Sequence, residues 1–226
     1  MTFTSPVLSY TLLSPMLILL GGALIGVLVE AFVSKAKRPI VQLTLALGVL
    51  TLALFQVWNI RGEQSLTPAM GSIIIDGPAL LLQGSILIIS IIAILLIADT
   101  EHFTALSAAL PGSEEERRAI AMGTQVTEVY PLTLFAVSGM LMFPVAGDLI
   151  TLFVALEMLS LPLYLMAGLS RRRRLASQES ALKYFLLGSF SSAFFLFGAA
   201  YLYGYSGSLD FAGIQASVVG GTGNDV

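Results

Sequence analysis

Residues 153–189, FVALEMLSLPLYLMAGLSRRRRLASQESALKYFLLGS, contain two long apolar runs on either side of four consecutive arginines. Glu157 lies inside the first run, and Glu179 and Lys183 open the second. A helix that crosses a bilayer needs about 20 mostly apolar residues, and basic residues gather in cytoplasmic loops. A short link usually joins antiparallel neighbours. The stretch therefore predicts two antiparallel transmembrane helices that carry charged residues.

The composition of the whole chain agrees with a polytopic membrane protein. Of its 226 residues, 56% are hydrophobic and only 11% are charged, whereas an ordinary soluble domain is about 25% charged. The absence of cysteine excludes disulfides and iron–sulfur clusters held by cysteine. The single histidine, His102, leaves no histidine cluster for zinc or haem, and we expect it to be a solvated loop residue.

Six segments are apolar and long enough to cross a membrane, and we expect all six to be helices. A membrane span must satisfy its backbone hydrogen bonds internally, and these runs do not alternate as barrel strands would. The fold class expected is therefore all-α, a transmembrane helix bundle. The six spans are about 10–33, 41–60, 80–98, 129–146, 149–169 and 179–203, and residues 204–226 are expected to form a tail or loop.

The basic residues predict the orientation. Nine of the eleven follow the first, third or fifth span, so a six-span chain places all nine on one side. The positive-inside rule makes this side cytoplasmic. Loops 34–39, 100–127 and 170–178 are then cytoplasmic, in a bacterial plasma membrane, and the N-terminus lies outside. The N-terminus lacks the basic start of a cleaved signal peptide, so the first run is expected to be a retained helix.

Two links between the spans carry local structural signals. Ser72–Ile75 is rich in β-formers and is followed by Asp76-Gly77, which predicts a hairpin-like turn. Ser113 precedes three glutamates, which is typical of a capped, short surface helix. Asp148 precedes the fifth span and is expected to cap it.

The charged residues inside the spans are the candidate functional groups. Glu157 has eight residues of its span before it and twelve after it, so it lies near mid-membrane. A charged side chain there costs about 2.5–3.5 kcal/mol on insertion scales. Glu157 is therefore either a proton- or ion-carrying site or a protonated acid that bonds a neighbouring helix. Lys183, one turn after Glu179, is either part of the same path, roughly 10 Å from Glu157, or a snorkelling lysine paired with Glu179.

Several motifs of the C-terminal half resemble the proton-pumping, antiporter-like membrane subunits of respiratory complex I, the bacterial NADH–quinone oxidoreductase. They are LFVALEMLSLPLY (152–164), ESALKYFLLGSFSSAFFLFG (179–198) and YGYSGSLDF (203–211), and EVYPLTLFAVSGMLMF (128–143) is similar to the fourth-helix region. The resemblance is strong over 128–211 and loose before it. It identifies Glu157 with the family's essential glutamate, and Lys183 and Glu179 with its helix-six motif.

The resemblance also implies a function and a set of partners. The chain would correspond to the N-terminal part of such a subunit, through helix six, and would translocate protons through Glu157, Lys183, Glu179 and lysines on later helices. It would be a non-redox subunit of an enzyme complex and would hold no cofactor. NADH, FMN, iron–sulfur clusters and quinone would belong to partner subunits of the membrane and peripheral arms.

Two other functions remain open at the level of sequence. One is a subunit of a related cation/proton antiporter or membrane-bound hydrogenase, which would have different partners. The other is a structural membrane scaffold in which Glu157 is only a packing acid. Membrane lipids are expected around the chain in every case, and no motif points to a nucleotide or a nucleic acid.

Overall fold

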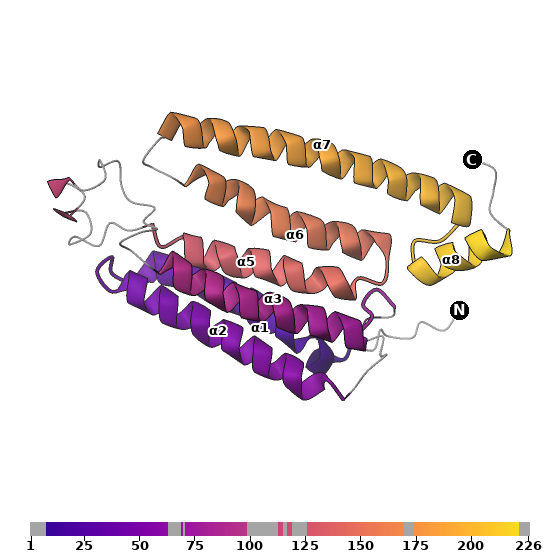
Figure 1. The fold of residues 1–226 in the computed structure, drawn as a ribbon, viewed down its shortest axis with the longest axis horizontal. Helices are drawn as coiled ribbons and strands as arrows, with labels where there is room; N and C mark the ends of the chain where they lie inside the picture. The colour runs from indigo at the N-terminus through magenta and orange to yellow at the C-terminus, as the bar shows by residue number, and fades with distance from the viewer. Residues whose placement is uncertain are drawn as a thin grey trace.

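The computed structural model describes residues 8–62, 69, 71–98, 113, 114, 117, 118, 126–169 and 174–221. These residues are helical apart from turns and isolated β-bridges, so the predicted all-α class is confirmed. In chain order the helices are α1 (Tyr10–Phe32), α2 (Arg38–Ile60), α3 (Gly77–Ile97), α5 (Val129–Met142), the 3-10 turn η1 (Phe143–Val145), α6 (Leu149–Gly168), α7 (Arg174–Ser206) and α8 (Phe211–Gly220). Figure 1 shows their arrangement.

Helix α5 is the centre of the bundle. It contacts α1, α2 and α3 on one side and α6 on the other, and nine of its fourteen residues are buried. Helix α7 forms the outermost layer and packs on α6 and α8 (Figure 1). The core of large buried side chains, such as Leu19, Leu50, Leu87 and Leu134, lies among α1, α2, α3 and α5. The order of layers from α5 through α6 to α7 therefore runs from the best-packed part of the bundle to the most exposed part.

Within the part of the chain that the structure describes, five helices are long and apolar enough to cross a membrane: α1, α2, α3, α6 and α7. The fourth expected span is shorter, because α5 has 14 residues and η1 adds three. At about 1.5 Å per α-helical residue and about 2.0 Å per 3-10 residue the pair is about 27 Å long. That length is close to the roughly 30 Å of a bilayer core.

The α-helical part of that segment ends early because of Pro144. Proline has no N–H, so the carbonyl of Leu141 cannot receive a bond from it when the chain tightens into a 3-10 turn. Gln83 of α3, which is buried, donates its side-chain N–H to this carbonyl at 2.8 Å. The buried amide thus satisfies an unpaired backbone acceptor and joins α3 to the centre of the bundle.

The links at one end of the bundle are joined by backbone hydrogen bonds and carboxylate caps. Ile73 pairs with Ala146, and Asp148 pairs with Asp210. The predicted hairpin is wrong: Ser72–Ile75 pairs with the segment after α5, and Asp76 caps α3 by accepting from the N–H of Ala79 at 2.8 Å. An Asp-Gly pair followed by proline is also typical of a helix start, and in this chain it forms the start of α3 and not a hairpin turn. The predicted cap by Asp148 is confirmed, since it accepts from the N–H of Thr151 at 2.6 Å.

The expected tail contains a further helix. Helix α7 begins at Arg174, before the expected start, because Leu175, Ala176 and Gln178 are good helix formers. It ends at Ser206, and α8 follows from Phe211 to Gly220 between an Asp210 cap and a left-handed Gly221. The hydroxyl of Ser208 and the N–H of Gly213 lower the pKa of Asp210, so the cap is charged at neutral pH.

The ends of the helices alternate along the bundle. Helices α1 and α6 end, and α2 and α7 begin, at one end of the bundle, whereas α2, α5 and α7 end, and α3, α6 and α8 begin, at the other (Figure 1). Lys35 and Lys37 therefore share an end with the start of α7. The predicted surface helix after Ser113 lies mostly outside the described residues, as do His102 and Arg171–Arg173.

Candidate functional site

Glu157 lies at the interface of α6 and α7, near the middle of α6. Eight residues of the helix precede it and eleven follow it. Its side chain is half-buried and accepts a hydrogen bond from the hydroxyl of Ser192, which is only 8% exposed. The mid-span acid therefore faces the neighbouring helix and has a polar partner there.

A close contact between α5 and α6 fixes the position of Glu157. A Cβ atom built on Gly139 would lie 2.5 Å from the backbone nitrogen of Leu159 and 2.8 Å from the carbonyl carbon of Met158. Real Cβ atoms do not approach other atoms so closely, so only glycine lets α5 approach α6 at this level. The contact lies one to two residues after Glu157 and holds its helix against the buried centre of the bundle.

Pro162 follows Glu157 by five residues and is buried inside α6. Because proline has no N–H, the carbonyl of Met158 loses its ordinary helical partner next to the Gly139 contact. The helix nevertheless continues without interruption to Gly168. A backbone acceptor of this kind close to an acid can hold a water molecule or another hydroxyl group.

Not every hydroxyl-bearing side chain of this part of α6 and α7 contacts Glu157. Ser192 does, whereas its neighbour Ser191 is exposed. The hydroxyl of Ser160 donates to the carbonyl of Leu156 at 2.6 Å, within its own helix. Tyr164 is buried two turns along α6, and its ring meets Tyr184 edge-on at 4.8 Å. The α6–α7 interface is therefore polar at Ser192 and aromatic toward the arginine end.

Tyr164 fits against α7 because residue 188 is glycine. A Cβ atom on Gly188 would lie 1.8 Å from the hydroxyl oxygen of Tyr164. The phenol thus occupies the space that a side chain would take, and the ring of Phe185 also meets it edge-on, with 5.8 Å between the ring centroids. Gly188 and Tyr164 fix the register of α7 on α6 and, with it, the partner of Glu157.

Lys183 does not contact Glu157. Its amine lies 2.5 Å from the carboxylate of Glu179, and the two side chains are 69% and 64% exposed. Lys183 precedes Ser192 by nine residues, which is about two and a half turns and about 14 Å along α7. Since Ser192 faces α6, Lys183 lies on the opposite face of α7. The expected separation of roughly 10 Å is therefore too short.

This geometry weakens the direct electrostatic coupling of the two groups. At an effective dielectric of about 20, unit charges about 14 Å apart interact by about 1.2 kcal/mol.

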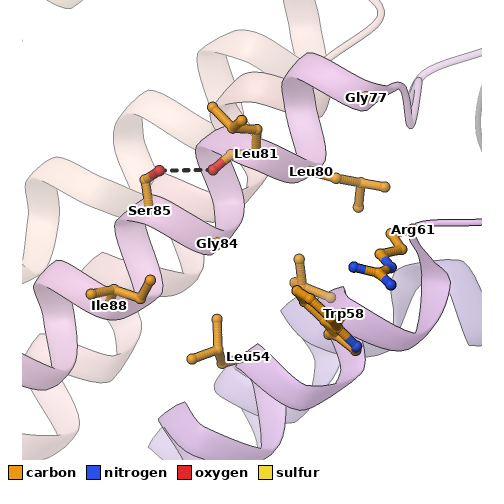
Figure 2. Close-up of a pocket in the computed structure, with 10 residues that line it drawn as sticks. Leu54, Trp58, Arg61, Gly77, Leu80, Leu81, Gly84, Ser85 and Ile88 are labelled. Atoms are coloured by element: carbon orange, nitrogen blue, oxygen red, sulfur yellow. Dashed lines mark hydrogen bonds between the residues drawn. The ribbon is translucent and has the colours of Figure 1, made fainter.

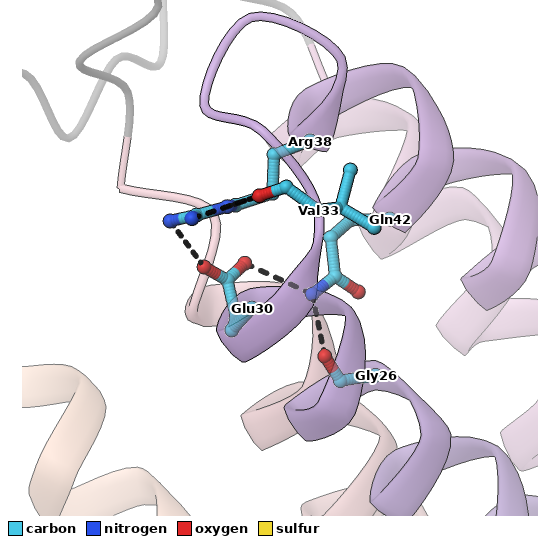
Figure 3. Close-up of polar contacts among 5 residues, drawn as sticks. All are labelled: Gly26, Glu30, Val33, Arg38 and Gln42. Atoms are coloured by element: carbon cyan, nitrogen blue, oxygen red, sulfur yellow. Dashed lines mark hydrogen bonds and ion pairs between the residues drawn. The ribbon is translucent and has the colours of Figure 1, made fainter.

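A second polar cluster, which the sequence analysis did not identify, joins α1 to α2 within the bundle. Arg38 donates to Glu30 at 3.1 Å, and Gln42, which is 1% exposed, donates to Glu30 at 2.9 Å and to the carbonyl of Gly26 at 2.8 Å (Figure 3). Arg38 also donates to the carbonyl of Val33. The sequence did contain a signal for this cluster. Arg38 and Gln42 are one helical turn apart, and the short turn before α2 brings that helix back alongside Glu30 at the end of α1.

The cluster lies close to α5. A Cβ atom on Gly26 would lie 3.0 Å from Pro131 and 3.3 Å from the side-chain oxygen of Gln42. Glu30 is thus held by one cation and one amide next to the central helix. Among the described residues, no three His, Asp or Glu side chains lie together as metal ligands would.

The chain is similar to membrane subunits of respiratory enzymes. A family model described as "NADH:quinone oxidoreductase/Mrp antiporter, TM" matches residues 146–224. The NADH-quinone oxidoreductase subunit N of Acidothermus cellulolyticus is 53% identical over 95% of this chain and 42% of its own length. That of Rhodococcus opacus is 50% identical over 98% of this chain and 45% of its own. The chain therefore spans less than half the length of these curated relatives.

Two solved structures have a similar fold. Respiratory complex I from Thermus thermophilus with bound aureothin contains a chain that is 30% identical, with a TM-score of 0.64 over 87% of this chain and 38% of that chain. The membrane-bound sulfane sulfur reductase, an archaeal respiratory membrane complex, has the same TM-score at 17% identity, over 92% of this chain and 30% of that chain. The second likeness concerns the fold alone.

Proposed function

Because the chain belongs to the family of antiporter-like membrane subunits of NADH-quinone oxidoreductase, we propose that it is part of a subunit that moves protons across the membrane. Quinone reduction by partner subunits drives this movement. The observation that carries the proposal is the hydrogen bond between Ser192 and Glu157 in the middle of two membrane helices. A titratable acid at this depth is rarely present without a function.

Ser192 is a suitable hydrogen-bond partner for an acid that gains and loses a proton. A hydroxyl group can donate to a carboxylate and, after rotation about its C–O bond, accept from the protonated acid. Glu157 therefore keeps a hydrogen bond in both protonation states. Neither protonation state therefore carries the free-energy penalty of a buried polar group without a partner.

Glu179 and Lys183 form the second station of the proposed path. Their ion pair lies on the face of α7 that points away from α6, toward the cytoplasmic end of the bundle. Opening of this pair would release Lys183 to take part in proton exchange and would change the packing of α7 on Tyr164. Since direct coupling with Glu157 is weak, we assign the communication to movement of α7.

The chain is proposed to act without a redox centre of its own. It contains no cysteine, and its described residues form no metal-ligand cluster. NADH, FMN, iron–sulfur clusters and quinone are assigned to partner subunits, with this chain embedded among the other membrane subunits. The end of the bundle at which α1 and α6 end and α2 and α7 begin is assigned to the cytoplasm, because it carries Lys35, Lys37, Arg38 and Arg174, the last residue of the arginine run.

The related cation/proton antiporters are the weaker alternative. The description of the family model includes them, but the relatives that are about 50% identical are named as subunits of NADH-quinone oxidoreductase. The two functions require different partner proteins, so identification of the partners separates them.

The test of the proposal is co-migration in native membranes. The tagged chain should migrate on a native gel with a large assembly that oxidises NADH. Disruption of its gene should abolish NADH-driven proton uptake into inverted vesicles. Migration of the tag with antiporter subunits, or as a small species apart from all NADH oxidation, would contradict membership of the complex.

A further inference from the structure

The interface of α6 and α7 is closed in different ways on the two sides of Glu157. Toward the start of α6, the ring of Phe153 stacks on the ring of Phe195, with 5.9 Å between the centroids and 22° between the planes. Phe153 precedes Glu157 by four residues, and Phe195 follows Ser192 by three. The stacked pair therefore lies about one turn, or about 6 Å, from the hydrogen bond between Ser192 and Glu157, on the same faces of the two helices.

Apolar surface continues from this pair toward the start of α6. A pocket of about 250 Å³ lies there between α6 and α7, and Phe153 is part of its wall. Tyr203, which is 51% exposed, has the only polar side chain among the lining residues. The others are apolar and include Leu149, Ile150, Leu196, Ala199 and Ala200. Such a pocket offers water few hydrogen-bond partners, so it does not connect Glu157 with the end of the bundle through ordered water.

On the other side of Glu157, the interface carries a hydroxyl group. The phenol of Tyr164 occupies the place that a side chain at Gly188 would take, so its oxygen lies between α6 and α7. Gly188 precedes Ser192 by four residues, which is again about one turn of α7. A phenol can both donate and accept a hydrogen bond. The neighbour of the acid is therefore polar toward the end of α6 and hydrocarbon toward its start.

We propose that Phe153 and Phe195 form a hydrophobic barrier between Glu157 and the outer side of the membrane. The proposal rests on the proposed function, in which Glu157 carries protons. A hydrophobic constriction stops protons because it excludes the water through which they move. With the two rings stacked, Glu157 exchanges its proton only toward the cytoplasmic end of this interface. Separation of α6 and α7 at the stacked pair opens the outer side, so these residues determine the side on which the proton is released.

A second apolar pocket of the bundle provides a comparison. It has a volume of about 510 Å³ and lies between α2 and α3, where Leu54, Trp58 and Ile88 are among the residues that line it (Figure 2). Helix α5 separates these two helices from α6. A polar side chain introduced into this pocket therefore changes an apolar surface without changing the neighbours of Glu157.

The test is the passive leak of protons through the assembled complex. Inverted vesicles receive an acid pulse without NADH, and a pH-sensitive dye follows the decay of the pH gradient. The decay rate is normalised to the amount of assembled complex, after subtraction of the rate in vesicles from a strain with a disrupted gene. Phe153→Ser and Phe195→Ser should each raise this leak about tenfold, because the hydroxyl gives water a partner where two rings excluded it. Phe153→Leu keeps the hydrocarbon and should leak as the wild type does.

Two controls separate the barrier from general damage to the bundle. Leu54→Ser introduces the same hydroxyl into the pocket between α2 and α3 and should leave the leak unchanged. The double variant Phe153→Ser with Glu157→Gln should leak no more than Glu157→Gln alone, because the opened path then meets a group that cannot titrate. NADH oxidation with artificial acceptors should stay nearly unchanged in all of these variants.

Two outcomes would overturn the proposal. One is a leak of wild-type size in Phe153→Ser and Phe195→Ser, and if only one of these variants assembles, its leak decides. The other is a leak in the double variant as large as in Phe153→Ser, since protons would then bypass Glu157. The acid pulse needs no NADH, so neither outcome depends on pumping. The proposed function fails separately, if NADH drives no more proton uptake in the wild type than in the disrupted strain.

Discussion

The hydroxyl of Ser192 on α7 donates a hydrogen bond to the carboxylate of Glu157 on α6. The bond links a mid-membrane acid to the outermost of the long helices, so a movement of α7 changes the partner of Glu157. The first prediction concerns this link. Ser192→Ala should lower NADH-driven proton uptake several-fold, because hydrogen bonds to charged groups contribute about 1.5–3 kcal/mol. Ser192→Thr should restore most of the activity, since it keeps the hydroxyl.

Ser191 provides the matched control for that substitution. It is the adjacent serine on the same helix, but its side chain is exposed. Ser191→Ala should pump as the wild type does. Equal losses in Ser191→Ala and Ser192→Ala would show that the effect comes from α7 in general and not from the bond to Glu157.

The second prediction concerns the close approach of α5 and α6. Gly139→Ala places a methyl group 2.5 Å from the backbone of Leu159, and backbone cannot move aside as a flexible side chain can. Such overpacking costs about 1–3 kcal/mol. The variant should therefore unfold at a lower temperature in detergent, as followed by Trp58 fluorescence. Gly48→Ala, where a Cβ atom has open space, should be as stable as the wild type or slightly more stable.

The third prediction concerns the cluster of Glu30, Arg38 and Gln42. Gln42→Leu has a side chain of similar length but leaves Glu30 with one partner fewer in a buried place. We expect a loss of stability of about 1–3 kcal/mol, measured by thermal unfolding. Thr44→Leu on the same helix is the control, because the hydroxyl of Thr44 is exposed and bonds only within α2. Equal stability of Gln42→Leu and the control would contradict the structural role of the cluster.

The fourth prediction concerns the orientation of the chain. Single cysteines at Ser34 and Gln178, which are both exposed, should react with a membrane-impermeant reagent from the cytoplasmic side. A cysteine at Ala212 in α8 should react from the opposite side. Labelling of Ser34→Cys and Gln178→Cys from different sides would contradict the proposed topology.

The fold could be predicted from the sequence where long apolar runs decide it. These runs gave the helices and their approximate ends, because a segment in lipid has no alternative to internal hydrogen bonds. The links were harder, because Asp76-Gly77 suits both a turn and a helix start. The β-bridge between Ile73 and Ala146, which lie more than seventy residues apart, decided between the turn and the helix start.

The site could be predicted only in part. The depth of Glu157 follows from its place in the run, but its partner depends on the register of α7 on α6. That register is fixed by Gly188 and Tyr164, a contact between helices that periodicity does not reveal. The same reason explains the misjudged distance to Lys183, since an estimate from depth alone ignores which face of α7 carries each side chain.

The central claim is that protons pass through the carboxyl group of Glu157. The most direct test is proton uptake into inverted vesicles driven by NADH, normalised to the amount of assembled complex, for Glu157→Gln. The amide keeps the shape and the hydrogen bond to Ser192 but cannot titrate. Proton uptake should fall by at least tenfold while NADH oxidation with artificial acceptors stays nearly unchanged, and Asp148→Asn, which preserves the cap of α6, should match the wild type. Uptake by Glu157→Gln at the wild-type rate would show that the path avoids this carboxylate and that Glu157 only packs the helices.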